Sequence, residues 1–151
     1  MKIVLQRVTR ASVMVDNHIV GSIGHGLLLL VGIENADGDD DIEWLCQKIV
    51  KIRLFNDSEG VMNLPILSLA DTGILVVSQF TLMASTRKGN RPSYIRAARP
   101  EIAVTIYERF VQRLNQLFGR PVQTGQFGAD MQVELVNDGP VTIIIDSKDR
   151  L

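Results

Sequence analysis

The chain has 151 residues, 46% of them hydrophobic, and carries a formal net charge of only -1 at pH 7. This length and composition predict one domain with a substantial core, and no Pro/Ser-rich linker divides the sequence. The first residues lack a signal-peptide pattern, the apolar run at 26–33 is too short to span a bilayer, and a single cysteine cannot form an internal disulfide. We therefore expect a soluble, cytoplasmic protein without a membrane partner.

The N-terminal third alternates apolar residues with turn residues, which is typical of a meander of short strands. These strands are predicted near residues 2–9, 11–16, 19–23 and 26–33. A helix is predicted near 39–54, because apolar residues recur there at helical spacing after three aspartates that suit a helix N-terminus. Cys46 lies on the apolar face of this helix with no base near it in the sequence, so we interpret it as a buried structural thiol.

A buried strand is predicted over residues 74–82, because branched apolar residues open this segment. The strand then runs into Ser78, Gln79 and Thr81. Buried hydroxyl and amide groups cost free energy unless they are paired, so a polar strand end indicates a site or a sheet rim facing water.

The loop that follows is basic. No acidic residue occurs from Gly73 to Pro100, and the basic residues in this stretch are Arg87, Lys88, Arg91, Arg96 and Arg99. Because the whole chain is almost neutral, this positive charge is local. Local positive charge beside a polar strand end suits a phosphate-bearing ligand.

A second helix is predicted from Pro100 to Gly119, since proline suits a first helical position and glycine a C-terminal cap. Its buried face is expected to contain Ala103, Ile106, Tyr107, Phe110, Leu114 and Leu117. Strands near 121–126, 131–136 and 141–146 follow, and residues 147–151 are interpreted as a polar tail. The pattern as a whole predicts a mixed α/β (α+β) domain built on antiparallel sheets.

The segment Asn137-Asp138-Gly139-Pro140-Val141-Thr142 places a Gly-Pro pair at the start of an apolar run, where neither residue favours a strand. Gly reaches positive φ, and Pro adopts the cis peptide more readily than any other residue. The segment taken alone indicates a hairpin turn between 133–136 and 141–145. It also fits a rigid corner that offers its backbone carbonyls to a ligand.

Conventional catalytic patterns are missing from the sequence. His18 and His25 both lie in predicted turns and are interpreted as solvent-facing residues. There is no Gly-x-Ser-x-Gly elbow, no zinc-type His/Cys spacing and no Gly-rich phosphate loop. Thr81 is a candidate nucleophile, but a threonine normally needs an adjacent base, and the sequence identifies none. We expect neither a metal nor a cofactor.

Ser78-Gln79-Phe80-Thr81-Leu82 and the 137–142 segment resemble the two signature motifs of the D-aminoacyl-tRNA deacylases, also called D-tyrosyl-tRNA deacylases. The similarity covers nearly the whole chain, including residues 6–13, 62–64, 91–93 and 124–131. The resemblance implies a barrel-like core flanked by helices and assembled as a homodimer. It also implies hydrolysis of the ester bond of D-aminoacyl-tRNA as a proofreading reaction, with glycyl-tRNA as a further substrate.

The resemblance further implies which residues form the site. In the family, the terminal adenosine of tRNA enters a pocket beside Ser78, Gln79, Phe80 and Thr81. Backbone N–H groups around Phe80 and Thr81 hold the scissile region there, and the ribose 2′-hydroxyl assists hydrolysis.

A cis Gly139-Pro140 pair is implied to reach into the partner subunit's site, where it rejects L-aminoacyl groups by steric conflict. Arg7 is similar to a family residue that buttresses this corner, and Met131 to one that lines the site.

A non-enzymatic alternative stays open at this point. The basic loop contains Tyr94 among its charges, so it would also suit an RNA-binding module that contacts phosphates and stacks a base. Binding alone would not require the Gly139-Pro140 corner.

Overall fold

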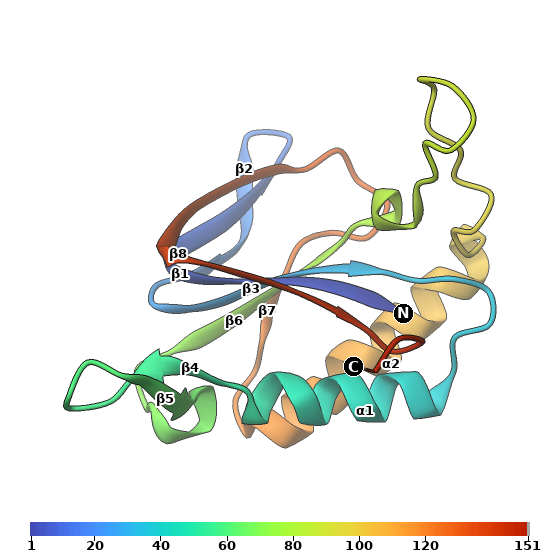
Figure 1. The fold of residues 1–151 in the computed structure, drawn as a ribbon. Helices are drawn as coiled ribbons and strands as arrows, with labels where there is room; N and C mark the ends of the chain where they lie inside the picture. Colours follow the sequence, from blue (N-terminus) through green and yellow to red (C-terminus); the bar gives the residue numbers. More distant parts are fainter. Residues whose placement is uncertain (151) are drawn as a thin grey trace.

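In the computed structural model, which describes residues 1–150, one nearly closed, barrel-like sheet packs against two helices (Figure 1). The strands run in the order β2-β1-β3-β6-β7, and β8 also pairs with β1. These strands are β1 (Lys2–Val15), β2 (His18–Ile23), β3 (Gly26–Gly32), β6 (Gly73–Ser78), β7 (Gln123–Thr124) and β8 (Gln132–Asp146). The helices are α1 (Asp39–Lys51) and α2 (Pro100–Phe118). The predicted α+β barrel-like architecture is confirmed.

The sheet is mixed, whereas antiparallel sheets are predicted from the sequence. β6 runs parallel to both β3 and β7, while β1 is antiparallel to β2, β3 and β8. Parallel neighbours need a long crossover connection, and α1 supplies part of the crossover between β3 and β6. The carboxyl end of β6 is therefore placed at the rim of the sheet, where the chain turns into the functional segment.

β1 is one continuous strand, although two strands, near 2–9 and 11–16, are predicted from the sequence. Its first half pairs with β3 and its second half with β2, while β8 pairs along its other edge. The exposed pair Thr9 and Arg10 lies at this change of partner. The polar residues therefore mark a change of neighbours and not an end of the strand.

β8 is also continuous, so the predicted hairpin turn at Gly139-Pro140 is wrong. Residues on both sides of Gly139-Pro140 pair with β1 and do not pair with each other. The β1–β8 partners on the two sides of the Gly-Pro pair are Gln6 with Thr142 and Val8 with Asn137. Residues 138–141 therefore stand opposite the single residue Arg7 and form a bulge, at which β8 bends sharply (Figure 1). The Gly139–Pro140 peptide bond in this bulge is cis.

Several element boundaries differ from the prediction. α1 ends at Lys51 and not near residue 54, because β4 (Arg53–Asn56) follows and pairs with β5 (Met62–Pro65), a short hairpin that the prediction lacks. β6 ends at Ser78, and the rest of the predicted 74–82 strand forms a 3₁₀ turn, η2 (Phe80–Met83). A second 3₁₀ turn, η1 (Ile66–Ser68), follows β5. The predicted strand at 121–126 shortens to the two residues of β7.

The predicted limits of α2 are confirmed. Pro100 is its first residue, and Gly119 caps its end in the left-handed conformation, with φ 76°. Five of the six residues predicted on its buried face are buried; Leu117 is half-buried and Phe118 is buried in addition. This face packs with α1 and the sheet into the main core. Cys46 lies fully inside it, and burial raises the pKa of its thiol to about 12, as expected for a structural cysteine.

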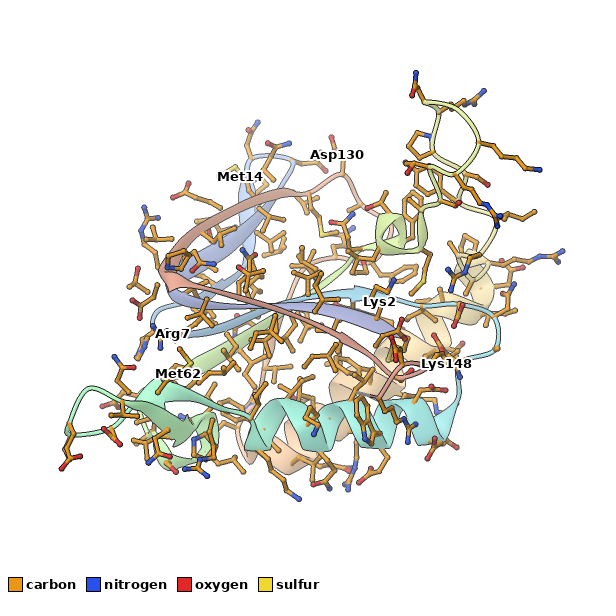
Figure 2. The ribbon with its side chains drawn as sticks, in the orientation of Figure 1. Lys2, Arg7, Met14, Met62, Asp130 and Lys148 are labelled. Carbon is orange, nitrogen blue, oxygen red and sulfur yellow. The ribbon has the colours of Figure 1, made fainter. Side chains whose placement is uncertain are left out.

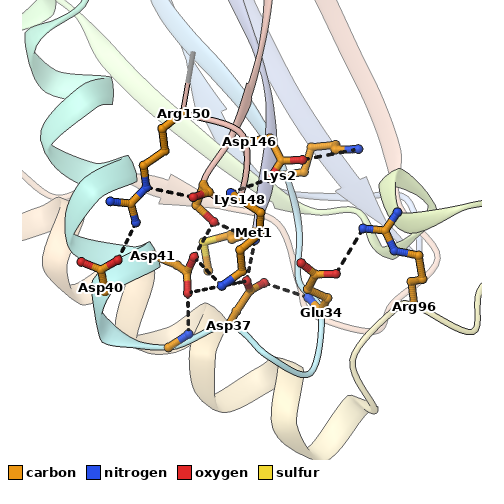
Figure 3. Close-up of polar contacts among 12 residues, drawn as sticks. Met1, Lys2, Glu34, Asp37, Asp40, Asp41, Arg96, Asp146, Lys148 and Arg150 are labelled. Carbon is orange, nitrogen blue, oxygen red and sulfur yellow. Dashed lines mark hydrogen bonds and ion pairs between the residues drawn. The ribbon is translucent and has the colours of Figure 1, made fainter.

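The two ends of the described chain meet at the start of α1 (Figure 3). The Met1 ammonium lies 2.5 Å from Asp37 Oδ1 and 2.9 Å from Ser147 Oγ, and the Asp37 side chain is fully buried. Ser147 Oγ donates to Asp41 Oδ1 at 2.6 Å. Residues 147–150, part of the predicted polar tail, are thus bonded to Met1 and to α1; Leu151 lies outside the described residues. None of the helices within residues 1–150 combines the length and the apolar character that crossing a membrane requires.

Candidate active site

A cavity of about 620 Å³ opens at the carboxyl end of β6. Its lining is mostly apolar and comes from four separate segments: the end of β3, the β6–η2 junction, the 94–103 stretch and the loop before β8. Lining residues include Val31, Val77, Ser78, Gln79, Phe80, Tyr94, Ala98, Arg99, Phe127, Gly128, Met131 and Val133. A cavity of this size and character is typical of a site for a nucleoside-sized ligand.

The structure brings some of the predicted site residues together. Ser78, Gln79, Phe80 and Met131 line the cavity, and Thr81 follows directly in η2. Gly139, Pro140 and Arg7 do not line it. In Figure 1 the bend of β8 lies on the left and the yellow-green η2 turn on the right, so one chain keeps these two groups apart.

The turn at the end of β6 is built by two local features. The amide N–H of Gln79 donates to the Val31 carbonyl at 2.8 Å, which continues the β3–β6 pairing by one residue beyond Ser78. Gly32 then lets η2 pack closely on β3, since an added Cβ would lie 2.9 Å from Leu82 Cβ and 3.2 Å from the Gln79 carbonyl oxygen. The role of Gly32 is not evident from the sequence, where its only signal is a glycine at the end of an apolar strand.

The first amide groups of η2 face no internal acceptor. In a helical turn the first N–H groups have no partner within the turn. Within residues 1–150, no hydrogen bond joins the N–H of Phe80 or Thr81 to another protein group. Phe80 lines the cavity and Thr81 follows it directly in η2, so both unpaired donors belong to the turn beside the cavity.

The Thr81 hydroxyl has an amide as its neighbour. Gln79 Nε2 donates to Thr81 Oγ1 at 2.5 Å, and this is the only side-chain hydrogen bond of Thr81 in the part of the chain that the structure describes. An amide nitrogen that donates cannot take up a proton, so this contact orients the hydroxyl but does not activate it as a nucleophile.

Aromatic side chains frame the cavity. Phe80 is 58% exposed and packs edge-to-face on Tyr94, with ring centroids 5.2 Å apart. On the other wall Phe127 packs against Tyr107, whose hydroxyl donates to the Val76 carbonyl at 3.2 Å and whose pKa burial raises to about 12. Exposed aromatic faces beside an apolar cavity suit the stacking of a base. Sequence reasoning did not assign Phe127 to the site, because residues 124–131 meet η2 only through the fold.

The Gly139-Pro140 bulge is held by side chains on both flanks. Arg7 is buried; its Nε donates to the Asp138 carbonyl at 2.9 Å and its Nη1 to the Leu54 carbonyl at 2.6 Å. Asn137 Oδ1 accepts from the Val141 amide at 2.7 Å, across the base of the bulge. Gly139 and Pro140 themselves are exposed. Figure 2 shows Arg7 on the bent side of β8, and Asp130, which precedes Met131, in the upper part of the molecule.

Gly139 is required by the backbone of the bulge. Its φ is 142°, and an added Cβ would lie 2.7 Å from Val141 Cγ2 and 2.9 Å from the Val141 amide nitrogen. A second hollow, of about 350 Å³, lies under the bulge between Arg7, Asp138 and the β4 segment. His25 lies at this hollow against Phe55, with Nε2 3.8 Å from Asp138 Oδ2, and it is exposed, as the sequence predicts.

Comparison with known proteins identifies the family of this chain. Residues 4–146 match the family model described as D-Tyr-tRNA(Tyr) deacylase. The chain is 60% identical to D-aminoacyl-tRNA deacylase of Bacteroides thetaiotaomicron over 151 residues, which is 99% of each chain. It is 57% identical to D-aminoacyl-tRNA deacylase of Flavobacterium psychrophilum over 150 residues, again 99% of each.

Two solved structures share the architecture. One, named c-Myc DNA Unwinding Element Binding Protein, has a TM-score of 0.89 at 40% identity and covers 97% of this chain and 98% of its own. The other, a probable eukaryotic D-amino acid tRNA deacylase, has a TM-score of 0.81 at 16% identity, covers 95% and 97%, and shows the shared fold. The chain belongs to the D-aminoacyl-tRNA deacylase family, as its two motifs indicate.

Proposed function

We propose that this protein hydrolyses the ester bond of D-aminoacyl-tRNA and releases the free D-amino acid and tRNA. The observation that carries the proposal is the apolar, aromatic-framed cavity beside the η2 turn, whose first two amide N–H groups have no acceptor within residues 1–150, in a chain 60% identical to a protein named for this activity. Aminoacylated tRNA is consumed in translation, so we place the reaction in the cytoplasm.

Hydrolysis of this ester requires the protein mainly to position the substrate and the attacking water. An aminoacyl ester is activated, and attack of water on its carbonyl carbon forms a tetrahedral oxyanion. We place this oxyanion at the N–H groups of Phe80 and Thr81, each of which supplies about 2.7–4 kcal/mol of transition-state stabilisation in comparable oxyanion holes. The ribose 2′-hydroxyl of the substrate assists the proton transfers. The terminal adenine stacks among Phe80, Tyr94 and Phe127 in the cavity.

We assign chiral selection to the Gly139-Pro140 bulge of a partner subunit. Support comes from its geometry: the bulge is exposed, is fixed by Arg7 and Asn137, and lies on the opposite side of its own chain from the cavity. A homodimer would bring each bulge to the cavity of the other subunit. Backbone carbonyls there would hold the substrate's α-amino group, and an L side chain would collide with the bulge.

The test is a comparison of substrates at equal enzyme concentration. We expect fast hydrolysis of D-aminoacyl-tRNA with varied side chains, detectable hydrolysis of glycyl-tRNA, which has no Cβ, and negligible hydrolysis of L-alanyl-tRNA. Retention of the tRNA without loss of the ester would favour an RNA-binding module. If L-alanyl-tRNA were hydrolysed as fast as glycyl-tRNA, the proposed steric selection at Cβ would be wrong.

A further inference from the structure

A basic hairpin, residues 85–93, projects from the body of the protein beside the cavity (Figure 1). Two backbone hydrogen bonds join its arms: the amide of Ser85 donates to the Ser93 carbonyl at 2.8 Å, and the amide of Ser93 donates to the Ser85 carbonyl at 2.9 Å. Its tip is exposed and contains Arg87, Lys88 and Arg91. The hairpin is thus a small, ordered projection with three cations at its end.

These three cations differ from most others in the protein. The other cations that form ion pairs with a carboxylate are Lys2, Arg7, Arg10, Arg96, Arg109, Arg113, Lys148 and Arg150. Within residues 1–150, no carboxylate lies within 4.0 Å of Arg87, Lys88 or Arg91. No Asp or Glu occurs near them in the sequence, from Gly73 to Pro100. The charge at the tip is therefore not used within the fold and is available to an anionic partner.

The hairpin is fixed relative to the cavity. Arg96 pairs with Glu34 at 3.3 Å, and the amide of Ala98 donates to the Ile33 carbonyl at 2.9 Å, so the second arm continues into a contact with the end of β3. Tyr94, which follows the hairpin directly, lines the cavity and packs on Phe80. The position of the tip relative to the cavity wall is therefore defined.

We propose that Arg87, Lys88 and Arg91 contact the phosphate backbone of the substrate's single-stranded 3′ end, where it leads into the acceptor stem. This inference rests on the proposed function. Arg91 is three residues from Tyr94, so the chain between them spans at most about 10 Å. This length corresponds to roughly three nucleotide steps along one nucleic-acid strand. A tRNA whose terminal nucleoside occupies the cavity therefore passes the tip within its last few nucleotides. Contacts to phosphates carry no sequence information, so the hairpin serves substrates of any amino-acid identity.

The experiment compares the full-length wild type with a triple variant, Arg87→Ala, Lys88→Ala and Arg91→Ala. A matched control removes three cations from the two helices: Lys48→Ala, Lys51→Ala and Arg109→Ala. Each protein is assayed with D-aminoacyl-tRNA and with the 3′-D-aminoacyl ester of adenosine, which fills the cavity but has no stem. KM and kcat are measured between 0.05 and 0.2 M salt.

We expect the hairpin variant to raise KM for D-aminoacyl-tRNA roughly 10–100-fold near physiological salt, with kcat unchanged. The slope of log KM against log salt should fall by about 2–3, because three phosphate contacts are lost. KM for the adenosine ester should stay the same, and the control variant should match the wild type for both substrates.

Other outcomes overturn the inference. An unchanged KM for the tRNA substrate would show that the hairpin does not contact it, and an equal rise for the adenosine ester would place its effect in the cavity. An equal loss in the control variant would show a general charge effect. If the wild type hydrolyses neither ester, the proposed function fails by itself. The hairpin is then judged by the salt-dependent Kd for uncharged tRNA, which must weaken in the hairpin variant alone.

Discussion

Arg7 Nε donates to the carbonyl oxygen of Asp138 at 2.9 Å, so a buried side chain of β1 supports the four-residue bulge at which β8 leaves the register of the sheet. The same guanidinium donates through Nη1 to the Leu54 carbonyl in β4. Arg7 thus connects the bulge to a neighbouring element from the inside of the molecule. This contact holds the bulge at the point where four residues of β8 stand opposite the single residue Arg7 of β1.

The first prediction concerns this support. Arg7→Ala should lower the free energy of unfolding by about 1–3 kcal/mol, because the Leu54 and Asp138 carbonyls lose a charged donor. It should also lower kcat/KM strongly for D-aminoacyl-tRNA, since the bulge loses its position. Arg10→Ala is the matched control on the same strand: its pair with Glu134 is exposed, and such pairs contribute only about 0–1 kcal/mol. Urea unfolding and steady-state assays measure both effects; equal losses in the two variants would contradict a supporting role for Arg7.

The second prediction concerns Asp41 and pH. Burial raises the pKa of Asp41, but hydrogen bonds from Ser147, Lys148 and the Gly38 amide outweigh it and lower the pKa to about 2 from its ordinary 3.8. A carboxylate with a depressed folded pKa stabilises the protein above its unfolded pKa, and this contribution is lost as pH falls from about 4 to about 2.

Asp41→Asn should therefore cost about 2 kcal/mol of unfolding free energy at pH 7. The difference from the wild type should shrink toward zero as the pH approaches 2. Urea unfolding at several pH values measures it, with Asp40→Asn as a control whose side chain is 86% exposed. A deficit that stays constant from pH 7 to pH 2 would show that the loss does not come from ionisation.

Some of these features can be read from the sequence because their cause is local. Pro100 and Gly119 delimit α2 through the fixed φ of proline and the left-handed φ of glycine, and neither depends on distant residues. The polar end of the strand at Ser78 likewise indicates the cavity, since buried polar groups need a reason.

Other features depend on residues far away in the chain. The hairpin reading of Gly139-Pro140 failed because both halves of β8 pair with β1, more than a hundred residues earlier, and no local pattern contains that information. Gly32 matters only because η2 packs on it, and Phe127 reaches the cavity only through the closure of the sheet. Long-range pairing thus decides which local signals become part of the site.

The third prediction is that Thr81→Ala keeps most of the deacylation activity. Its hydroxyl accepts from the Gln79 amide and has no base beside it, while the Thr81 N–H stays in place after the substitution. We expect kcat within about tenfold of the wild type, because a neutral hydrogen bond contributes only about 0.5–1.5 kcal/mol. Complete inactivation with unchanged fold and tRNA binding, or a trapped acyl-threonine, would restore a covalent threonine mechanism.

The fourth prediction isolates a backbone donor. Phe80 is the first residue of η2, a position where proline is tolerated in a helical turn, so Phe80→Pro removes the N–H without preventing the turn. Phe80→Ala is the matched variant, which removes the ring but keeps the N–H. We expect kcat of the proline variant to be about 10²–10³-fold below that of the alanine variant, the usual effect of losing one oxyanion donor. Equal kcat values in two folded variants would exclude the Phe80 amide from the transition state.

The fifth prediction concerns Gly139 and the partner subunit. Gly139→Ala should remove most D-aminoacyl-tRNA hydrolysis, because its Cβ would lie 2.7 Å from Val141 Cγ2 at a φ of 142°. Gly24→Ala is the control, since a Cβ there meets no atom within 4 Å. Near-normal activity of Gly139→Ala would contradict a role for the bulge in the site.

If the bulge acts in the other subunit, two inactive variants should complement each other. Subunits with Gly139→Ala and subunits with Phe80→Pro are mixed, and the mixed dimers are purified by two different tags and verified by mass. In such a dimer one cavity has both an intact η2 and an intact bulge, whereas the other cavity has neither. We therefore expect activity to return to about half of the wild-type kcat, with an unchanged preference for D-aminoacyl-tRNA. Verified mixed dimers that remain as inactive as their parents would show that each chain builds its site alone, and a purely monomeric wild type in solution would lead to the same conclusion.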